Sequence, residues 1–243
     1  MKTDLIIPIG NDCRIAIYLD RLKLRKYAFP LDWMLNFSFN DILQLFSTDF
    51  KTFFTDISLN KDIKNGDNKL VVMDNRNKML SLHHFPPDIP LPESQTNVRK
   101  LMLKRYKLLK GLIRFSRHIT FISFRDEDEA AQIGFLENMF KITNKNLLLV
   151  NITSKQETKF REIIINGHLK IMQYEFNNSP LADYHYENDV SADMLGNINK
   201  WEEIVGQFKY SFYGKLMFWA SKKIMRLKKM SKKQYKDKSV ISR

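Results

Sequence analysis

The chain contains one cysteine, and its position in the sequence is typical of a catalytic nucleophile. Cys13 follows the apolar run 5–9 and the turn formers Gly10, Asn11 and Asp12, and it precedes a helical pattern. A thiol in the first turn of a helix faces unpaired N–H groups and the positive end of the helix dipole, and both favour the thiolate. The alternative is an inert, packed cysteine, because free cysteine is among the most buried residue types. We expect the sulfur to lie open to solvent at the rim of a sheet, with an imidazole nearby.

Two histidines are candidates for the base that a cysteine nucleophile needs. His83 ends a predicted strand, and its alternative role is structural, at the end of a hairpin. His185 lies between Asp183 and Asp189, which could orient its ring or form surface turns. The residues themselves leave open which histidine serves Cys13.

A third candidate is Asp32, which lies in a proline turn beside Trp33. Its carboxylate could orient a histidine, bind a substrate hydroxyl or cap the next turn. No two histidines have the spacing of metal ligands on a helix, and a glycine-rich phosphate loop of the usual kinds is absent. The sequence therefore predicts neither a metal nor a cofactor.

The elements that would position these residues alternate between strand and helix. Apolar runs and turn signals predict strands at 5–9, 69–74, 78–83, 119–124, 146–152 and 169–176. Helical spacing predicts helices at 13–23, 39–54 (as one helix or two), 97–117, 129–142 and 155–165, while the four prolines of 84–92 exclude regular structure there. This order predicts an α/β fold with a doubly wound, mostly parallel sheet and flanking helices. Functional groups collect beyond the carboxyl ends of such strands, which is where Cys13 falls.

Several residues follow a recognisable pattern. The pattern consists of a glycine, a cysteine two or three residues later, a leucine-rich helix, an arginine and a Pro-Phe-Asp-Trp sequence. This chain matches it at Gly10, Cys13, Ala16, Leu19, Leu24, Arg25, Pro30, Asp32 and Trp33, with Leu31 in place of the phenylalanine. A later His-Asp-Phe triplet is matched by His83 and Phe85, with His84 where aspartate is common. Over residues 5–125 the chain thus resembles a bacterial family of unknown function described as papain-like cysteine peptidases.

The resemblance implies that Cys13 is the nucleophile, and it selects His83 as its base. It implies hydrolysis or acyl transfer at an acyl or peptide-like carbonyl, and, because members are often associated with surface-polysaccharide synthesis, a small-molecule, glycan or lipid-linked substrate. Papain-like enzymes carry the cysteine on a long helix against a separate β-barrel that supplies the histidine, whereas the alternating pattern here predicts a different fold. The rival hypothesis is a non-catalytic protein that binds a carbohydrate or a partner at the membrane surface.

The charge of the chain is concentrated at its end. The net charge is +13, but residues 209–243 hold twelve basic residues against the single acid Asp237, so the first 208 residues are nearly neutral. We expect an α/β catalytic domain over 1–208 and a basic amphipathic helix and tail over 209–243. One apolar stripe is formed at helical spacing by Tyr213, Leu216, Met217, Ala220, Ile224 and Leu227.

This tail has three readings. It could dock on an anionic membrane surface through 209–238, since each basic residue near such a surface contributes about 1 kcal/mol. It could instead pack its stripe on the domain and leave a solvated basic end. Nucleic acid is disfavoured, because the nearly neutral body offers no recognisable reading module.

The remaining features of the sequence predict where in the cell the protein is found. A single cysteine excludes an intramolecular disulfide, the first residues are too short for a signal-peptide core, and no window holds the roughly 18 apolar residues of a membrane span. We therefore expect a cytoplasmic protein that is peripheral to the inner face of the membrane.

Overall fold

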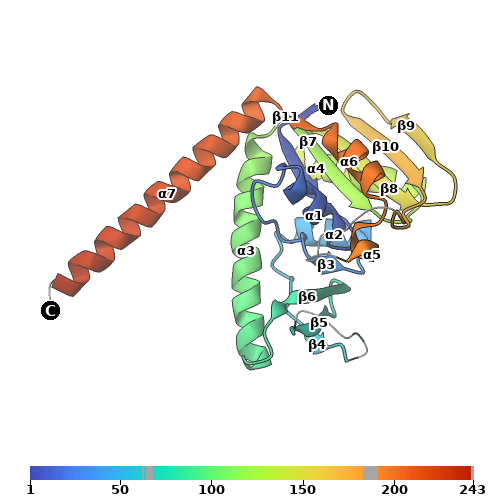
Figure 1. Cartoon of the computed structure of the whole chain (residues 1–243). Helices are drawn as coiled ribbons and strands as arrows, with labels where there is room; N and C mark the ends of the chain where they lie inside the picture. Colours follow the sequence, from blue (N-terminus) through green and yellow to red (C-terminus); the bar gives the residue numbers. More distant parts are fainter. Residues whose placement is uncertain (62, 64–67, 183–190, 242–243) are drawn as a thin grey trace.

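The computed structural model describes residues 1–61, 63, 68–182 and 191–241, with side chains as far as residue 226. A five-stranded sheet forms the centre, a smaller sheet lies beside it, and a long helix leaves the body at an angle (Figure 1). The central sheet contains, in spatial order, β2 (Leu5–Pro8), β7 (His118–Phe124), β8 (Asn146–Ser154), β10 (Leu169–Phe176) and β9 (Lys159–Ile164).

The central sheet is mostly parallel, as predicted. β2, β7, β8 and β10 run parallel, and each lies next to the preceding one in chain order. Only β9, at the edge, is antiparallel. The α/β class with flanking helices and a C-terminal helix is confirmed.

Helices cover both faces of this sheet. The helices of the chain are α1 (Arg14–Arg21), α2 (Phe39–Ser47), α3 (Leu91–Phe115), α4 (Glu129–Thr143), α5 (Ala192–Leu195), α6 (Ile198–Gly206) and α7 (Phe212–Ile241). On one face Phe121 of β7 packs against Phe135 of α4, with ring centroids 5.3 Å apart. On the other, Phe124 of the same strand packs against Trp201 of α6 at 5.4 Å. Alternate residues of one buried strand thus supply both layers of the core.

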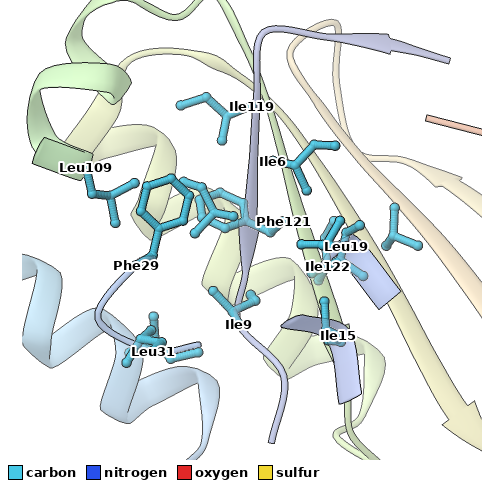
Figure 2. Close-up of a cluster of buried hydrophobic side chains, with 14 of the residues drawn as sticks. Ile6, Ile9, Ile15, Leu19, Phe29, Leu31, Leu109, Ile119, Phe121 and Ile122 are labelled. Carbon is cyan, nitrogen blue, oxygen red and sulfur yellow. The ribbon is translucent and has the colours of Figure 1, made fainter. Parts of the chain in front are cut away.

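Figure 2 shows this core around β2. Ile15 and Leu19 of α1 lie on one side of the strand, near Ile122, while Phe29, Leu109 of α3 and Phe121 lie on the other. Gly10 follows the strand, and a Cβ there would stand 2.5 Å from Ile15 Cδ1. The glycine therefore lets the turn pass close over α1.

Two predicted elements need correction. The helix expected at 155–165 is wrong, because this segment holds the antiparallel strand β9, which pairs with β10. The following Asn166 and Gly167 are a hairpin signal that the helical reading overlooked. The helix expected at 97–117 instead begins at Leu91, inside the segment expected to be irregular, because Pro92 occupies a first-turn position where its missing N–H costs nothing.

A second, antiparallel sheet is inserted between α1 and α3. Its strands, in spatial order, are β3 (Met34–Leu35), β6 (Met79–Phe85), β5 (Leu70–Asp74) and β4 (Ile57–Leu59). The predicted hairpin at 69–83 is confirmed as β5 and β6. This sheet carries His83 on β6, away from the parallel sheet that leads to Cys13.

The two ends of the body meet. β1 (Lys2–Thr3) pairs in parallel with β11 (Lys209–Tyr210), so residues 209–210 belong to a strand and the C-terminal helix starts at Phe212. Gly214 in its first turn packs so tightly that a Cβ would stand 2.6 Å from the carbonyl oxygen of Asp4. Among the described helices, none is long and apolar enough to cross a membrane.

Candidate active site

Cys13 and His83 are in contact, although Cys13 follows a strand of the central sheet and His83 lies in the second sheet. Cys13 is the N-cap residue of α1, and its carbonyl accepts the N–H of Ile17 at 3.1 Å. Its Sγ lies 3.4 Å from Nε2 of His83. This distance is a hydrogen bond to sulfur, and it places an imidazole where it can take the thiol proton.

The sulfur is less accessible than we expected from the sequence. Cys13 is only 2% exposed, so the expectation that its sulfur lies open to solvent is wrong. The second sheet lies beside the carboxyl end of β2 and brings His83 onto the sulfur. The expectation of a nearby imidazole is confirmed.

The ring of His83 is held from the side by Trp33. The two ring centroids are 5.5 Å apart with planes at 72°, an edge-to-face contact. Trp33 directly precedes β3, whose Met34 is opposite Ser81 on β6. The pairing of these two strands therefore fixes the tryptophan next to the histidine.

A buried arginine fixes the turn that carries Cys13. Arg125, just after β7, donates to the carbonyl oxygens of Ile9 and Phe37 at 2.6 Å each, and to Glu127 at 2.8 Å. The side chain of Asn11 accepts the N–H of Phe37 at 2.9 Å. These bonds connect the nucleophile turn to the end of the second sheet.

The residues on either side of Cys13 form an ion pair. Asp12 accepts the N–H of Arg14 at 2.9 Å, and the two side chains lie 3.3 Å apart. Burial raises the pKa of the Asp12 carboxyl, and the charge of Arg14 opposes that rise. Arg14 also donates to the carbonyls of Asp193 and Met194 at 2.9 and 2.7 Å.

His185, the second candidate base, lies outside the described residues, as do Asp183 and Asp189. The contacts of Arg14 show that the chain following residue 190 lies against the first turn of α1. Of the two candidate bases, only His83 therefore has a contact with Cys13 that the structure describes.

Asp32 is tied to an arginine and to its own turn. Its Oδ2 accepts from Nε and Nη2 of Arg25 at 2.9 and 2.7 Å, and from the N–H of Phe29 at 3.0 Å. Its Oδ1 has no hydrogen-bond partner among the residues that the structure describes. Burial raises the pKa of Asp32 to about 6, although the charge of Arg25 opposes the rise. The guanidinium of Arg25 in turn lies 5.3 Å from the ring of Trp33.

His84 has a different role from its neighbour. Its Nδ1 is 2.9 Å from the hydroxyl of Ser81, and its Nε2 is 3.3 Å from Nη1 of Arg105 on α3. Burial, together with the charges of Arg105 and His83, lowers the pKa of His84 to about 3. His84 is therefore neutral at physiological pH, and the charge of Arg105 is opposed by the carboxylate of Asp32 and not by this histidine.

Sequence reasoning brought together Cys13 and His83, and it missed most of what holds them. Arg125 and Arg105 were not singled out, because their partners lie far away along the chain. A usable signal was present for Arg125, since a charged residue that ends a buried strand needs local partners. Within the described part of the chain, no cluster of three or more His, Cys, Asp or Glu side chains is arranged to hold a metal ion.

Comparison with known proteins gives one match. A family model described as "Putative papain-like cysteine peptidase (DUF1796)" matches residues 4–211, which ends directly before α7. No curated protein and no solved structure matches the chain.

Proposed function

The chain belongs to this family of papain-like cysteine peptidases, and from that membership we propose that the protein is an enzyme with Cys13 as its nucleophile and His83 as its base. The family description supports a hydrolase with a cysteine nucleophile, and the chain has one cysteine. The observation that carries the proposal is the 3.4 Å separation of Cys13 Sγ and His83 Nε2. Two residues 70 positions apart, one at the N-terminus of α1 and one on β6, are brought to a distance suited to proton transfer.

The proposed reaction is attack on an acyl or peptide-like carbonyl. His83 takes the proton from the thiol, and the sulfur forms a bond to the carbonyl carbon while the carbonyl π electrons move to oxygen. When the tetrahedral intermediate collapses, the leaving group departs with the proton from His83, and a thioester remains on Cys13. Water, or an acceptor hydroxyl, then attacks the thioester carbon while it gives its proton to His83. The C–S bond breaks, and His83 returns the proton to the Cys13 sulfur, so the free thiol and the neutral imidazole are restored. Water gives hydrolysis, and the hydroxyl gives acyl transfer.

Asp32 is a positioning residue in this proposal. It holds Arg25 in a two-pronged ion pair, Arg25 lies over Trp33, and Trp33 packs edge-on against His83. The carboxylate thus acts on the imidazole through two intermediate side chains. Such a chain of contacts sets the angle of the ring without touching the reacting atoms.

The protein is also proposed to dock on an anionic membrane surface through residues 209–238, where a lipid-linked or glycan substrate of surface-polysaccharide synthesis would be found. Phe212 and Trp219 of α7 are 84% and 60% exposed, and Lys222, Lys223 and Arg226 on the same helix are exposed. Exposed aromatic rings beside basic residues suit the headgroup zone of a bilayer. Flotation with anionic vesicles, with and without residues 212–243, tests the docking, and equal flotation would remove it.

Alkylation of Cys13 by iodoacetamide as a function of pH tests the catalytic proposal without a known substrate. The absolute rate is low because the sulfur is buried, so the midpoint of the pH profile is compared. We expect wild type to react with a midpoint well below that of a free thiol, and His83→Asn to shift it to about pH 8.5. His168→Asn, which changes an exposed histidine beside the edge hairpin, is the matched control and should leave the midpoint unchanged.

Identical profiles for wild type and His83→Asn would mean that the imidazole does not activate the thiol. The rival hypothesis, a non-catalytic binding protein, is separated by Cys13→Ser. This variant should fold and lose all turnover if the enzyme proposal holds, whereas a Cys13→Ser protein with unaltered biological activity would support the binding protein.

A further inference from the structure

An apolar groove of about 740 Å³ separates α7 from α3. It is lined mainly by apolar side chains, among them Leu108, Leu112 and Phe115 of α3 and Leu216, Ala220 and Ile224 of α7. Phe115, Leu216 and Ile224 are each about half exposed or more. The apolar stripe of the C-terminal helix therefore faces the body, as packing on the domain requires, but the space between the two helices is not filled.

The groove has an apolar end and a basic end. The two helices lie closest where α3 ends and α7 begins, and they diverge toward the start of α3 (Figure 1). Lys104, Arg105 and Lys107 line the groove on the part of α3 nearer the wide end. Lys222, Lys223 and Arg226 of α7 are exposed but are not among the residues that line the groove, so its basic end is formed by α3. No acidic side chain is among the described residues that line the groove.

We propose that this groove binds one lipid molecule, with its hydrocarbon chain along the apolar part and an anionic, phosphate-type head at the basic end. The hydrocarbon chain removes apolar surface from water along the part of α3 from Leu108 to Phe115, a rise of about 10 Å. The head pairs with cations that have no acidic partner along the groove. A second copy of this protein fits poorly, because it would bring another strongly basic α7 to the same place.

Arg105 connects the groove to the candidate active site. Its side chain lines the groove, and its Nη1 is 3.3 Å from Nε2 of His84. His84 follows His83 on β6. The basic end of the groove therefore lies beside the strand that carries the proposed base. A head group bound at Arg105 would therefore lie beside β6, the strand that also carries His83. The inference that this lipid is the substrate rests on the proposed function, whereas the inference that the groove binds the lipid does not.

Gly111 offers a way to fill the groove selectively. It lies within α3 and lines the groove, and a Cβ at this position meets no atom within 4 Å. Glycine is unfavourable in a helix interior relative to alanine, so substitution here does not disturb folding through the backbone. Gly111→Trp would place an indole in the groove, and Gly111→Ala is the matched control that leaves the groove open.

The experiment is calorimetric titration of the full-length protein with monomeric dodecyl phosphate, below its micelle concentration. We expect saturable binding by wild type and Gly111→Ala, at least tenfold weaker binding by Gly111→Trp, and weaker binding by Arg105→Gln. Inorganic phosphate, which lacks the chain, and dodecyltrimethylammonium, which reverses the head charge, should each bind at least tenfold more weakly than dodecyl phosphate.

Equal binding of dodecyl phosphate by Gly111→Trp and wild type would overturn the proposal, as would equal binding of the cationic amphiphile. Sedimentation supplies another contrary outcome: a wild-type dimer that Gly111→Trp converts to a monomer would make a second copy the occupant. Two measurements separate the proposals. Saturable binding of dodecyl phosphate by wild type, together with an alkylation profile that His83→Asn leaves unchanged, would keep the groove proposal and remove the enzyme proposal.

Discussion

The surroundings of Cys13 and the surface of α7 are built in opposite ways. Around Cys13, polar side chains are buried and bonded, and Arg125 alone joins three segments of the chain. Along α7, large apolar side chains are exposed, and Trp219 shows 60% of its surface where Cys13 shows 2%. The contrast shows that the body covers the side chains of its own site, whereas the described part of α7 leaves several large apolar side chains exposed.

The largest expected effect comes from removing the arginine that joins the site. Arg125→Met removes the guanidinium donor from two buried carbonyls and from Glu127, which keeps the N–H of Phe39, and it should lower the free energy of unfolding by about 5 kcal/mol. Chemical denaturation measures the change. Arg161→Met, which removes an arginine with exposed ion pairs on β9, is the control and should change stability by less than about 0.5 kcal/mol. Equal effects would mean that the site is not held by Arg125.

A smaller effect should separate two neighbours on α7. Phe218 is 5% exposed and packs on Tyr210 and Tyr27, with centroids 4.8 and 5.9 Å apart, whereas Trp219 is exposed. Phe218→Ala should cost about 3 to 4 kcal/mol, and Trp219→Ala less than about 0.5 kcal/mol. Trp219→Ala should instead weaken flotation with anionic vesicles. If both substitutions had the same effect on unfolding, α7 would not be divided into a packed side and an exposed one.

The smallest effect concerns the pH dependence of Asp32. Its pKa in the folded protein, about 6, lies above the ordinary 3.8, so the folded state binds the proton more tightly than the unfolded state. The stability this gives is complete below pH 3.8 and is lost as the pH rises through 6, by at most about 3 kcal/mol. Denaturation of wild type and Asp32→Asn from pH 4 to 7 should therefore show that the free energy of unfolding of wild type falls relative to that of Asp32→Asn as the pH rises.

Asp20 provides a control for the loss of a carboxylate partner of Arg25. It pairs with the same arginine, but its side chain is 55% exposed, so Asp20→Asn should change the free energy of unfolding by less than about 1 kcal/mol. A wild-type advantage over Asp32→Asn that grew with pH would mean that the ion pair with Arg25 outweighs burial.

The parts of the fold that the sequence predicts are those set by local patterns. Buried runs such as residues 119–124 and 146–152 were identified as strands because most of their residues are apolar, and the acidic turn before α4 supplied its N-cap, Asp128. β9 was missed because five of its six side chains are exposed and give no clear alternation. An edge strand is specified by its partner β10 rather than by its own residues.

The candidate site shows the same limit. Cys13 could be found from the strand, turn and helix around it, and His83 from a resemblance in short motifs. The contacts between Arg105 and His84, and between Arg125 and Ile9, join residues 21 and 116 positions apart, and no local pattern encodes them. The groove could not be foreseen either, since the apolar stripe of α7 is equally compatible with full packing on the domain.

The order of strands in the central sheet has a consequence for how the protein is made. β2, β7, β8 and β10 lie side by side in the order in which a ribosome would release them, so the sheet can grow at one edge during synthesis. The edge of β8 then stays unpaired until β10, which β9 covers on its other side, pairs with it. A nascent chain that stalls before this point would aggregate through that edge. Pairing of β1 with β11 comes after the central sheet is complete, because β11 follows β10 in the chain.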